Sequence, residues 1–333
     1  MQPAVRARAW CRVDLAGGTL DIWPLGVLHA GAVTVNLAID VAVTVTVQTP
    51  VDKAFHVVPG DSPALRADTA EELARHPDGA LVGTVLAALG APPVTVRLAS
   101  GSPRGGGLGA SSAMAVALVA AVEEHLGRPA SPPERRVALA RDLEARLMGL
   151  PTGVQDHWPG LVGGALVLRH GPGGTTVERP DVDLGALEAS LLVAYTGVSH
   201  FSAGQNWQVV RRRLDGEAEA CRLFAGIAAV AGRAAEALAA GDLPRLGRLV
   251  GDEWALRRRL AEGVSVPAIE RLLAAARDAG AWGGKACGAG GGGCVAVLCP
   301  PERRPAVAAA LEAAGGRLLA AAPAAGALAV ERL

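Results

Sequence analysis

The sequence has no excess of either charge and no long apolar run, and each absence excludes a class of protein. Lys plus Arg and Asp plus Glu both number 32 among 333 residues, so no overall basic field would attract nucleic acid or an anionic membrane. No run of about twenty uncharged apolar residues occurs, which argues against a membrane span. The early arginines are not followed by the apolar segment of a secretory leader, so we expect a cytoplasmic protein.

The sequence also lacks the cysteine patterns that would indicate a redox pair or a zinc site. The five cysteines form no CxxC pair and have no histidine at zinc-ligand spacing, so we read them as reduced, mostly buried thiols. Hydrophobic residues make up 50% and charged residues 19% of the chain, which argues against disorder. The length is sufficient for two domains.

The densest cluster of glycine is the segment 102–113, which reads Ser-Pro-Arg-Gly-Gly-Gly-Leu-Gly-Ala-Ser-Ser-Ala. The residues after it predict an amphipathic helix over 111–126, with an apolar face of Met114, Leu118, Val122 and Leu126. A glycine-rich loop that opens a helix presents unpaired N–H groups and the positive end of the helix dipole, which favours phosphate. The segment lacks the ending of a P-loop and the spacing of a dinucleotide fingerprint. The alternative is a flexible turn before a core helix.

Period-two alternation predicts long strands over 4–15 and 33–47 in an antiparallel sheet. Other predicted strands are 94–98, 165–169, 175–179, 191–195, 317–321 and 328–332. Predicted helices are 71–89, 131–149 with Ser131 as its cap, 203–214, 217–240, 242–262, 266–279 and 301–314. This mixture predicts the α+β class, with domains 1–185 and 186–333.

Two carboxylates follow the glycine loop. Glu144 lies on an apolar helix face, where an unpaired charge is costly. It either pairs with Arg141 or Arg146, or binds Mg²⁺ together with the Ser111 hydroxyl and nucleotide phosphates. Asp156 follows in a turn rich in glycine and proline, where it either caps the backbone or addresses an acceptor hydroxyl.

A second glycine cluster, 285–294, reads Lys-Ala-Cys-Gly-Ala-Gly-Gly-Gly-Gly-Cys. It allows the backbone to pass close to a substrate, or forms a mobile turn before an apolar strand.

Together these motifs resemble those of the GHMP kinases (galactokinase, homoserine, mevalonate and phosphomevalonate kinases). Segment 103–113 resembles their ATP-binding motif, Pro-x-Gly-x-Gly-Leu-Gly/Ser-Ser-Ser-Ala. Segment 151–156 is similar to their Gly-x-x-Asp segment, and 288–294 to their C-terminal Gly-Ala-Gly-Gly-Gly-Gly-Cys motif. The resemblance implies a two-domain α+β fold, with a left-handed βαβ crossover in the N-terminal domain, a ferredoxin-like C-terminal domain and the site between them.

The resemblance also implies the cofactors ATP and Mg²⁺ and the residues that hold them. The expected nucleotide-binding residues are Pro103, Arg104, Gly105, Gly106, Gly107, Leu108, Gly109, Ala110, Ser111 and Ser112. Ser111 and Glu144 are expected to bind Mg²⁺. Asp156 would take the proton of the acceptor hydroxyl or merely orient it, and the sequence leaves both roles open.

Segment 12–21, Arg-Val-Asp-Leu-Ala-Gly-Gly-Thr-Leu-Asp, resembles the first motif of the sugar 1-kinases in this family. By that resemblance Arg12 stabilises the transferring charge and Asp21 binds sugar hydroxyls. The glycines are closer to those of heptose-phosphate and fucose kinases, although Leu20 departs from both. The expected substrate-binding residues are Gly18, Thr19, Asp21, Asp156, His200, Gly290 and Gly291.

His200 stands where heptose-kinase-like sequences usually carry arginine. If that arginine serves a substrate phosphate, its absence argues against a phosphorylated sugar. The alternative is an ordinary surface histidine.

The sequence therefore predicts an ATP-dependent kinase acting on the anomeric hydroxyl of a hexose or heptose, either free or already phosphorylated. We expect a monomer or homodimer with a small-molecule substrate and no nucleic-acid or membrane partner. The alternatives are a kinase for homoserine or a mevalonate derivative, an ATP-coupled decarboxylase, and a non-catalytic sensor that binds sugar or ATP. The segment 12–21 argues against the first, and the set Ser111, Glu144 and Asp156 argues against the sensor.

Overall fold

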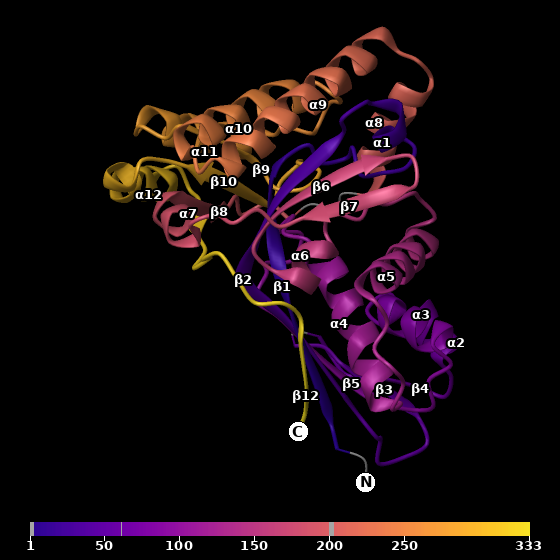
Figure 1. Cartoon of the computed structure of the whole chain (residues 1–333). Helices are drawn as coiled ribbons and strands as arrows, with labels where there is room; N and C mark the ends of the chain where they lie inside the picture. The colour runs from indigo at the N-terminus through magenta and orange to yellow at the C-terminus, as the bar shows by residue number, and fades with distance from the viewer. Residues whose placement is uncertain (1–2, 61, 200–202) are drawn as a thin grey trace.

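The computed structural model describes residues 3–60, 62–199 and 203–333. At its centre, strands β1 (Val5–Ala16) and β2 (Val33–Gln48) pair antiparallel over most of their length (Figure 1). The predicted antiparallel pairing is therefore confirmed. The register shifts between Trp10 and Cys11 and again between Asp14 and Ala16. Such irregularities bend a strand and redirect its side chains, and these two flank Arg12.

Within the described residues, the first sheet has eight strands, in the order β12-β1-β2-β5-β3-β4 with β6 and β7 branching from β2. Their bounds are β3 (Phe55–Val58), β4 (Leu65–Ala67), β5 (Thr95–Ser100), β6 (Ala165–Gly171), β7 (Gly174–Glu178) and β12 (Ala329–Arg332). Strand β2 is long enough to pair with β6 through its first half and with β5 through its second. The last strand, β12, returns to pair with β1, and the two lie together in Figure 1.

A second sheet, again over the part of the chain that is described, has four strands in the order β11-β8-β10-β9. These are β8 (Leu191–Tyr195), β9 (Gly283–Ala286), β10 (Cys294–Leu298) and β11 (Arg317–Leu318). The accompanying helices are α8 (Ala203–Leu214), α9 (Ala218–Ala239), α10 (Leu243–Arg257), α11 (Pro267–Asp278) and α12 (Arg304–Ala313), preceded by the 3₁₀ turn η1 (Pro301–Arg303). Helix α9 contacts β1 and β2 while α10 contacts β9, so this helical layer joins the two sheets. The division into 1–185 and 186–333 stays a prediction, and β12 from the second half pairs with the first sheet.

The remaining helices are α1 (Leu25–Leu28), α2 (Ala70–Arg75), α3 (Ala80–Ala88), α4 (Ala110–His125), α5 (Pro133–Met148), α6 (Trp158–Val162) and α7 (Leu184–Ser190). The prediction of one helix over 71–89 is wrong, because the helix is interrupted between α2 and α3. Pro77 disfavours the helical conformation of the residue before it, and His76 is extended, with ψ of 128°.

Two further details of the predicted helices are wrong. Helix α4 is buried on nearly all its faces, because alanines and valines outside the predicted stripe also pack against β1, β2, α5 and α6. Ser131 does not cap α5. Its hydroxyl instead donates to Glu123 at 2.5 Å, and Pro132 precedes the helix without a side-chain cap. In the described part of the chain, we find no helix long and apolar enough to cross a membrane.

Candidate active site

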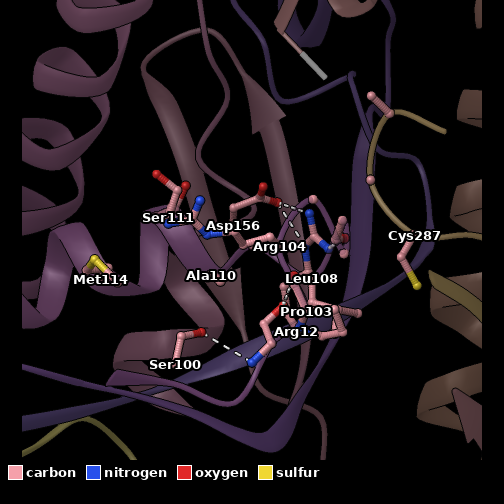
Figure 2. Close-up of a pocket in the computed structure, with 18 of the residues that line it drawn as sticks. Arg12, Ser100, Pro103, Arg104, Leu108, Ala110, Ser111, Met114, Asp156 and Cys287 are labelled. Atoms are coloured by element: carbon pink, nitrogen blue, oxygen red, sulfur yellow. Dashed lines mark hydrogen bonds and ion pairs between the residues drawn. The ribbon is translucent and has the colours of Figure 1, made fainter. Parts of the chain in front are cut away.

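A cavity of about 740 Å³ lies between the loop that precedes α4 and the glycine-rich loop between β9 and β10 (Figure 2). All the predicted nucleotide-binding residues, 103–112, line it. The predicted residues Arg12, Thr19, Asp156 and Gly290 line the same cavity. Four other predicted residues of the described chain do not: Gly18, Asp21, Glu144 and Gly291. His200 lies outside the described residues.

The loop before α4 has the geometry of an anion site. Gly105, Gly107 and Gly109 have φ of 64°, 70° and 72°, in the left-handed region that favours glycine. A Cβ at Gly107 would lie 2.5 Å from the carbonyl oxygen of Cys287, so a side chain has no space there. Gly109 immediately precedes α4 and has no side chain to accept the first helical N–H groups. Because Ala110, Ser111 and Ser112 line the cavity, the start of α4 lies at its wall, where unpaired N–H groups and the positive end of the helix dipole favour an anion.

Arg12 joins three segments at the centre of this cavity. Its Nε and Nη2 donate to Oδ1 of Asp156 at 2.8 and 2.5 Å, and its Nη1 donates to the carbonyl oxygen of Gly107 at 2.5 Å. The Arg12 side chain is 2% exposed, whereas that of Asp156 is 33% exposed. Figure 2 shows this ion pair as dashed lines, with Met114 on α4 at a distance from it. The buried Arg12 therefore holds the Asp156 carboxylate in place, while that carboxylate remains accessible from the cavity.

Glu144 contacts Ser111, which was expected to share Mg²⁺ with it, and also Ser112 and His157, which were not expected. It accepts hydrogen bonds from the hydroxyls of Ser111 at 2.9 Å and Ser112 at 2.8 Å. Its Oε2 also lies 2.7 Å from Nε2 of the fully buried His157. The alternative that Glu144 pairs with Arg141 is wrong, since Arg141 pairs with the neighbouring Asp142.

No motif in the sequence pointed to His157, because only the fold brings the turn at 157 to Glu144 in the C-terminal half of α5. Burial opposes the charged form of both groups, but each stabilises the charge of the other. The pKa of Glu144 is accordingly lowered by His157 and the two serines, and the pKa of His157 is raised by Glu144. We therefore describe them as a buried ion pair.

The residues at this point are suited to Mg²⁺. Ser111 and Glu144 supply hard oxygen donors at the edge of the phosphate loop, and Mg²⁺ typically combines one or two such donors with waters and substrate phosphates. Within the residues that the structure describes, no group of three or more His, Cys, Asp and Glu forms a closed metal cage. Ser111 lines the cavity and its hydroxyl contacts Glu144, so these two residues would hold a Mg²⁺ ion whose other ligands are water and phosphate oxygens.

Asp21 packs against the turn that carries Asp156. Its Oδ2 accepts the backbone N–H of Gln155 at 2.9 Å, and its buried Oδ1 has no hydrogen-bond partner among the described residues. A Cβ on Gly153 would lie 1.8 Å from Oδ2, so only glycine allows this approach. Burial raises the pKa of Asp21 to about 6, the Gln155 N–H opposes the shift, and the charge of Asp156 adds to it.

We expect Asp21→Asn to raise the free energy of unfolding at about pH 7.5 by about 2 to 3 kcal/mol, and by much less near pH 4. The folded-state pKa exceeds the ordinary value of 3.8, so the fold favours the protonated carboxyl. The natural chain therefore loses stability as the pH rises from about 4 through 6. The variant does not, because asparagine does not ionise. Urea denaturation at both pH values measures the difference. A difference that is the same at both would contradict the assigned burial of Asp21.

The second glycine-rich loop packs against the first loop and against Val264. The N–H of Cys294 donates to the carbonyl oxygen of Gly106 at 2.8 Å, and the N–H of Gly291 donates to that of Val264 at 2.8 Å. A Cβ on Gly290 would lie 2.1 Å from the same Val264 oxygen. The glycines thus allow the two loops to meet backbone to backbone at the cavity.

Comparison with known proteins agrees with this geometry. The family model described as the GHMP kinase N-terminal domain matches residues 78–164, and the model of the GHMP kinase C-terminal region matches residues 234–317. The chain is 27% identical over 193 residues to a D-glycero-alpha-D-manno-heptose 7-phosphate kinase of Campylobacter jejuni, a match covering 56% of each chain. It is 35% identical over 204 residues to a mevalonate kinase of Aeropyrum pernix, covering 60% of this chain and 58% of that one. The matches thus span little more than half the length of these relatives.

Among solved structures, a D-glycero-D-manno-heptose 1-phosphate kinase from Bacteroides thetaiotaomicron superposes with a TM-score of 0.78 at 21% identity, covering 99% of both chains. At this identity the likeness concerns the fold. Both family models match in the expected order, and the architecture agrees along the whole chain. The chain therefore belongs to the GHMP kinase family.

Proposed function

We propose that the chain is an ATP- and Mg²⁺-dependent kinase that phosphorylates the anomeric hydroxyl of a sugar. The observation that carries the proposal is the ion pair of Arg12 and Asp156, which lies in the same cavity as the glycine-rich loop. An anion site, a fixed cation and an accessible carboxylate are the parts from which phosphoryl transfer is built, since it depends mainly on positioning and electrostatics.

Each part has a distinct task in this proposal. The loop and the start of α4 bind the nucleotide phosphates, and Met114 offers apolar surface for the base. Ser111 and Glu144 hold Mg²⁺, which when bound neutralises phosphate charge. Asp156 accepts a hydrogen bond from the acceptor hydroxyl and orients it or takes its proton, while Arg12 stabilises the charge that develops during transfer.

Two observations favour a sugar as acceptor. The segment 12–21, which resembles the first motif of the sugar 1-kinases, brings Arg12 and Thr19 to the wall of the cavity. The relative from Campylobacter jejuni is named as a heptose phosphate kinase. A mevalonate-type alcohol is the second candidate, because the relative from Aeropyrum pernix with 35% identity is named as a mevalonate kinase.

The test is release of ADP from Mg-ATP in the presence of free hexoses and heptoses, sugar phosphates, mevalonate and homoserine. We expect turnover with a sugar and none with the two non-sugar alcohols. Turnover with mevalonate alone would replace the sugar by the second candidate. ATP binding without turnover on any acceptor would contradict the kinase and favour a sensor.

A further inference from the structure

A second cluster of charged side chains is buried beside the cavity, where the two sheets meet. It consists of Asp14 on β1, Glu253 and Arg257 on α10, and Lys285 on β9, each no more than 2% exposed. Two carboxylates and two cations balance in charge. Since charged groups are costly to bury, such a cluster persists only when every member is paired.

The pairs form a continuous chain from one sheet to the other. Lys285 Nζ lies 3.0 Å from Oδ2 of Asp14 and 3.1 Å from Oε2 of Glu253. Arg257 Nε and Nη2 donate to the other oxygen of Glu253, Oε1, at 2.8 and 2.5 Å. Arg257 is therefore held in one orientation by a carboxylate that Lys285 fixes from the opposite side.

The free edge of the Arg257 guanidinium is directed at the turn 17–21. Its Nη2 donates to the carbonyl oxygen of Gly18 at 2.5 Å, and its Nη1 donates to the hydroxyl of Thr19 at 3.1 Å. The N–H of Gly17 donates to Glu253 at 3.3 Å. A Cβ on Gly18 would lie 2.6 Å from Asp14 Oδ2, so the turn is in direct contact with the cluster.

The turn has a backbone conformation that requires such support. Thr19 has φ of 75°, which is rare for a β-branched residue. Strained conformations of this kind persist where surrounding contacts determine them, and they are concentrated at functional sites. Thr19 lines the cavity, and Asp21 follows two residues later. The conformation of the turn therefore sets where both residues stand relative to an acceptor.

We propose that Arg257 is a positioning residue, which, with Glu253, Lys285 and Asp14, holds the turn 17–21 in the shape that binds the acceptor. The part of this inference that concerns the acceptor rests on the proposed function. Arg257 is not among the residues that line the cavity in the described chain, so it acts through the backbone of the turn. Helix α10 of the second half thereby controls a binding element of the first.

Arg257→Lys tests the proposal, because lysine keeps the charge but lacks the planar fork that reaches Glu253, Gly18 and Thr19 together. We expect hydrogen–deuterium exchange of the amides in 17–23 to become about tenfold faster or more, with exchange in 104–112 unchanged. The matched control is Arg258→Lys on the next residue, whose side chain is 47% exposed and pairs with Glu270. Exchange in 17–23 at the natural rate, or acceleration throughout the chain, would overturn the proposal.

The kinetic arm uses whichever acceptor supports ADP release. Arg257→Lys should raise KM for that acceptor about tenfold or more, while KM for ATP changes by less than about twofold. Equal increases in both would indicate general loss of structure and overturn the positioning role. If no acceptor supports turnover, the proposed function fails, whereas the exchange experiment still decides whether the cluster holds the turn.

A second variant covers the case in which Arg257→Lys does not fold. The double change Glu253→Gln with Arg257→Met removes one charge of each sign and leaves Asp14 paired with Lys285. We expect the same selective exchange in 17–23 from this variant. A folded double variant whose turn exchanges as slowly as that of the natural chain would refute the inference.

Discussion

Asp156→Asn is expected to lower kcat by about 100- to 10,000-fold while the affinity for ATP changes by less than about twofold. Asparagine keeps an oxygen that can accept from Arg12, but it cannot take a proton and carries no charge. Steady-state ADP release gives kcat, and calorimetric titration with a non-hydrolysable ATP analogue gives the affinity. The loss corresponds to about 3 to 5 kcal/mol of the activation free energy.

The matched control is Asp142→Asn, an exposed carboxylate on α5 that pairs with Arg141. The kcat of this control should equal that of the natural chain. Full activity of Asp156→Asn would remove the role that we assign to this residue. The size of the loss also separates the two roles left open by the sequence, because orientation alone survives the change better than proton transfer does.

Arg12→Met should lower kcat by about 100- to 1000-fold, the usual effect of removing one preorganised donor or cation from a site of developing charge. Methionine fills a similar volume but donates nothing to Asp156 or to the carbonyl oxygen of Gly107. Thermal unfolding should show only a modest loss of stability, because Asp156 is 33% exposed and can be hydrated when its partner is removed.

The control for this change is Arg8→Met, four residues earlier on the same strand. Arg8 is exposed and stacks on Trp10 at 4.5 Å, away from the cavity. Its loss should leave kcat unchanged. If Arg12→Met unfolded the protein instead of lowering kcat, the structural role of the guanidinium would outweigh the proposed electrostatic one.

Local sequence patterns were sufficient for most of the secondary structure. Alternation in the segments 4–15 and 33–47 gave β1 and β2 nearly to the residue, since one face of each strand must be apolar. The errors arose where the spacing of apolar residues was followed although another property, a proline or the small size of neighbouring residues, decided the structure. The apolar residues of 71–89 continue past Pro77, although the proline breaks the helix. In α4 the predicted stripe was real, but the small residues outside it are buried as well.

The candidate site was predictable where its residues have a role in motifs that resemble those of a known family, and not where contacts outside those roles form. The loop 103–112, Arg12 and Asp156 line one cavity as the motifs suggested. His157 and the cluster around Glu253 were missed, because the contacts of His157 with Glu144 and of Lys285 with Asp14 and Glu253 join separate elements of the fold. Lys285 on β9 contacts both Asp14 on β1 and Glu253 on α10, and no spacing in the sequence encodes these contacts.

The backbone bond between the two glycine-rich loops has a consequence for how ligands enter and leave. Cys294 N–H binds the carbonyl oxygen of Gly106, so each loop forms part of the wall of the other. A clamshell rotation of one sheet away from the other would have to break this bond and the ion pair of Lys285 with Asp14 together. Movement of short segments at the cavity would leave both contacts intact, so it costs less free energy than such a rotation and favours gating on the timescale of loops.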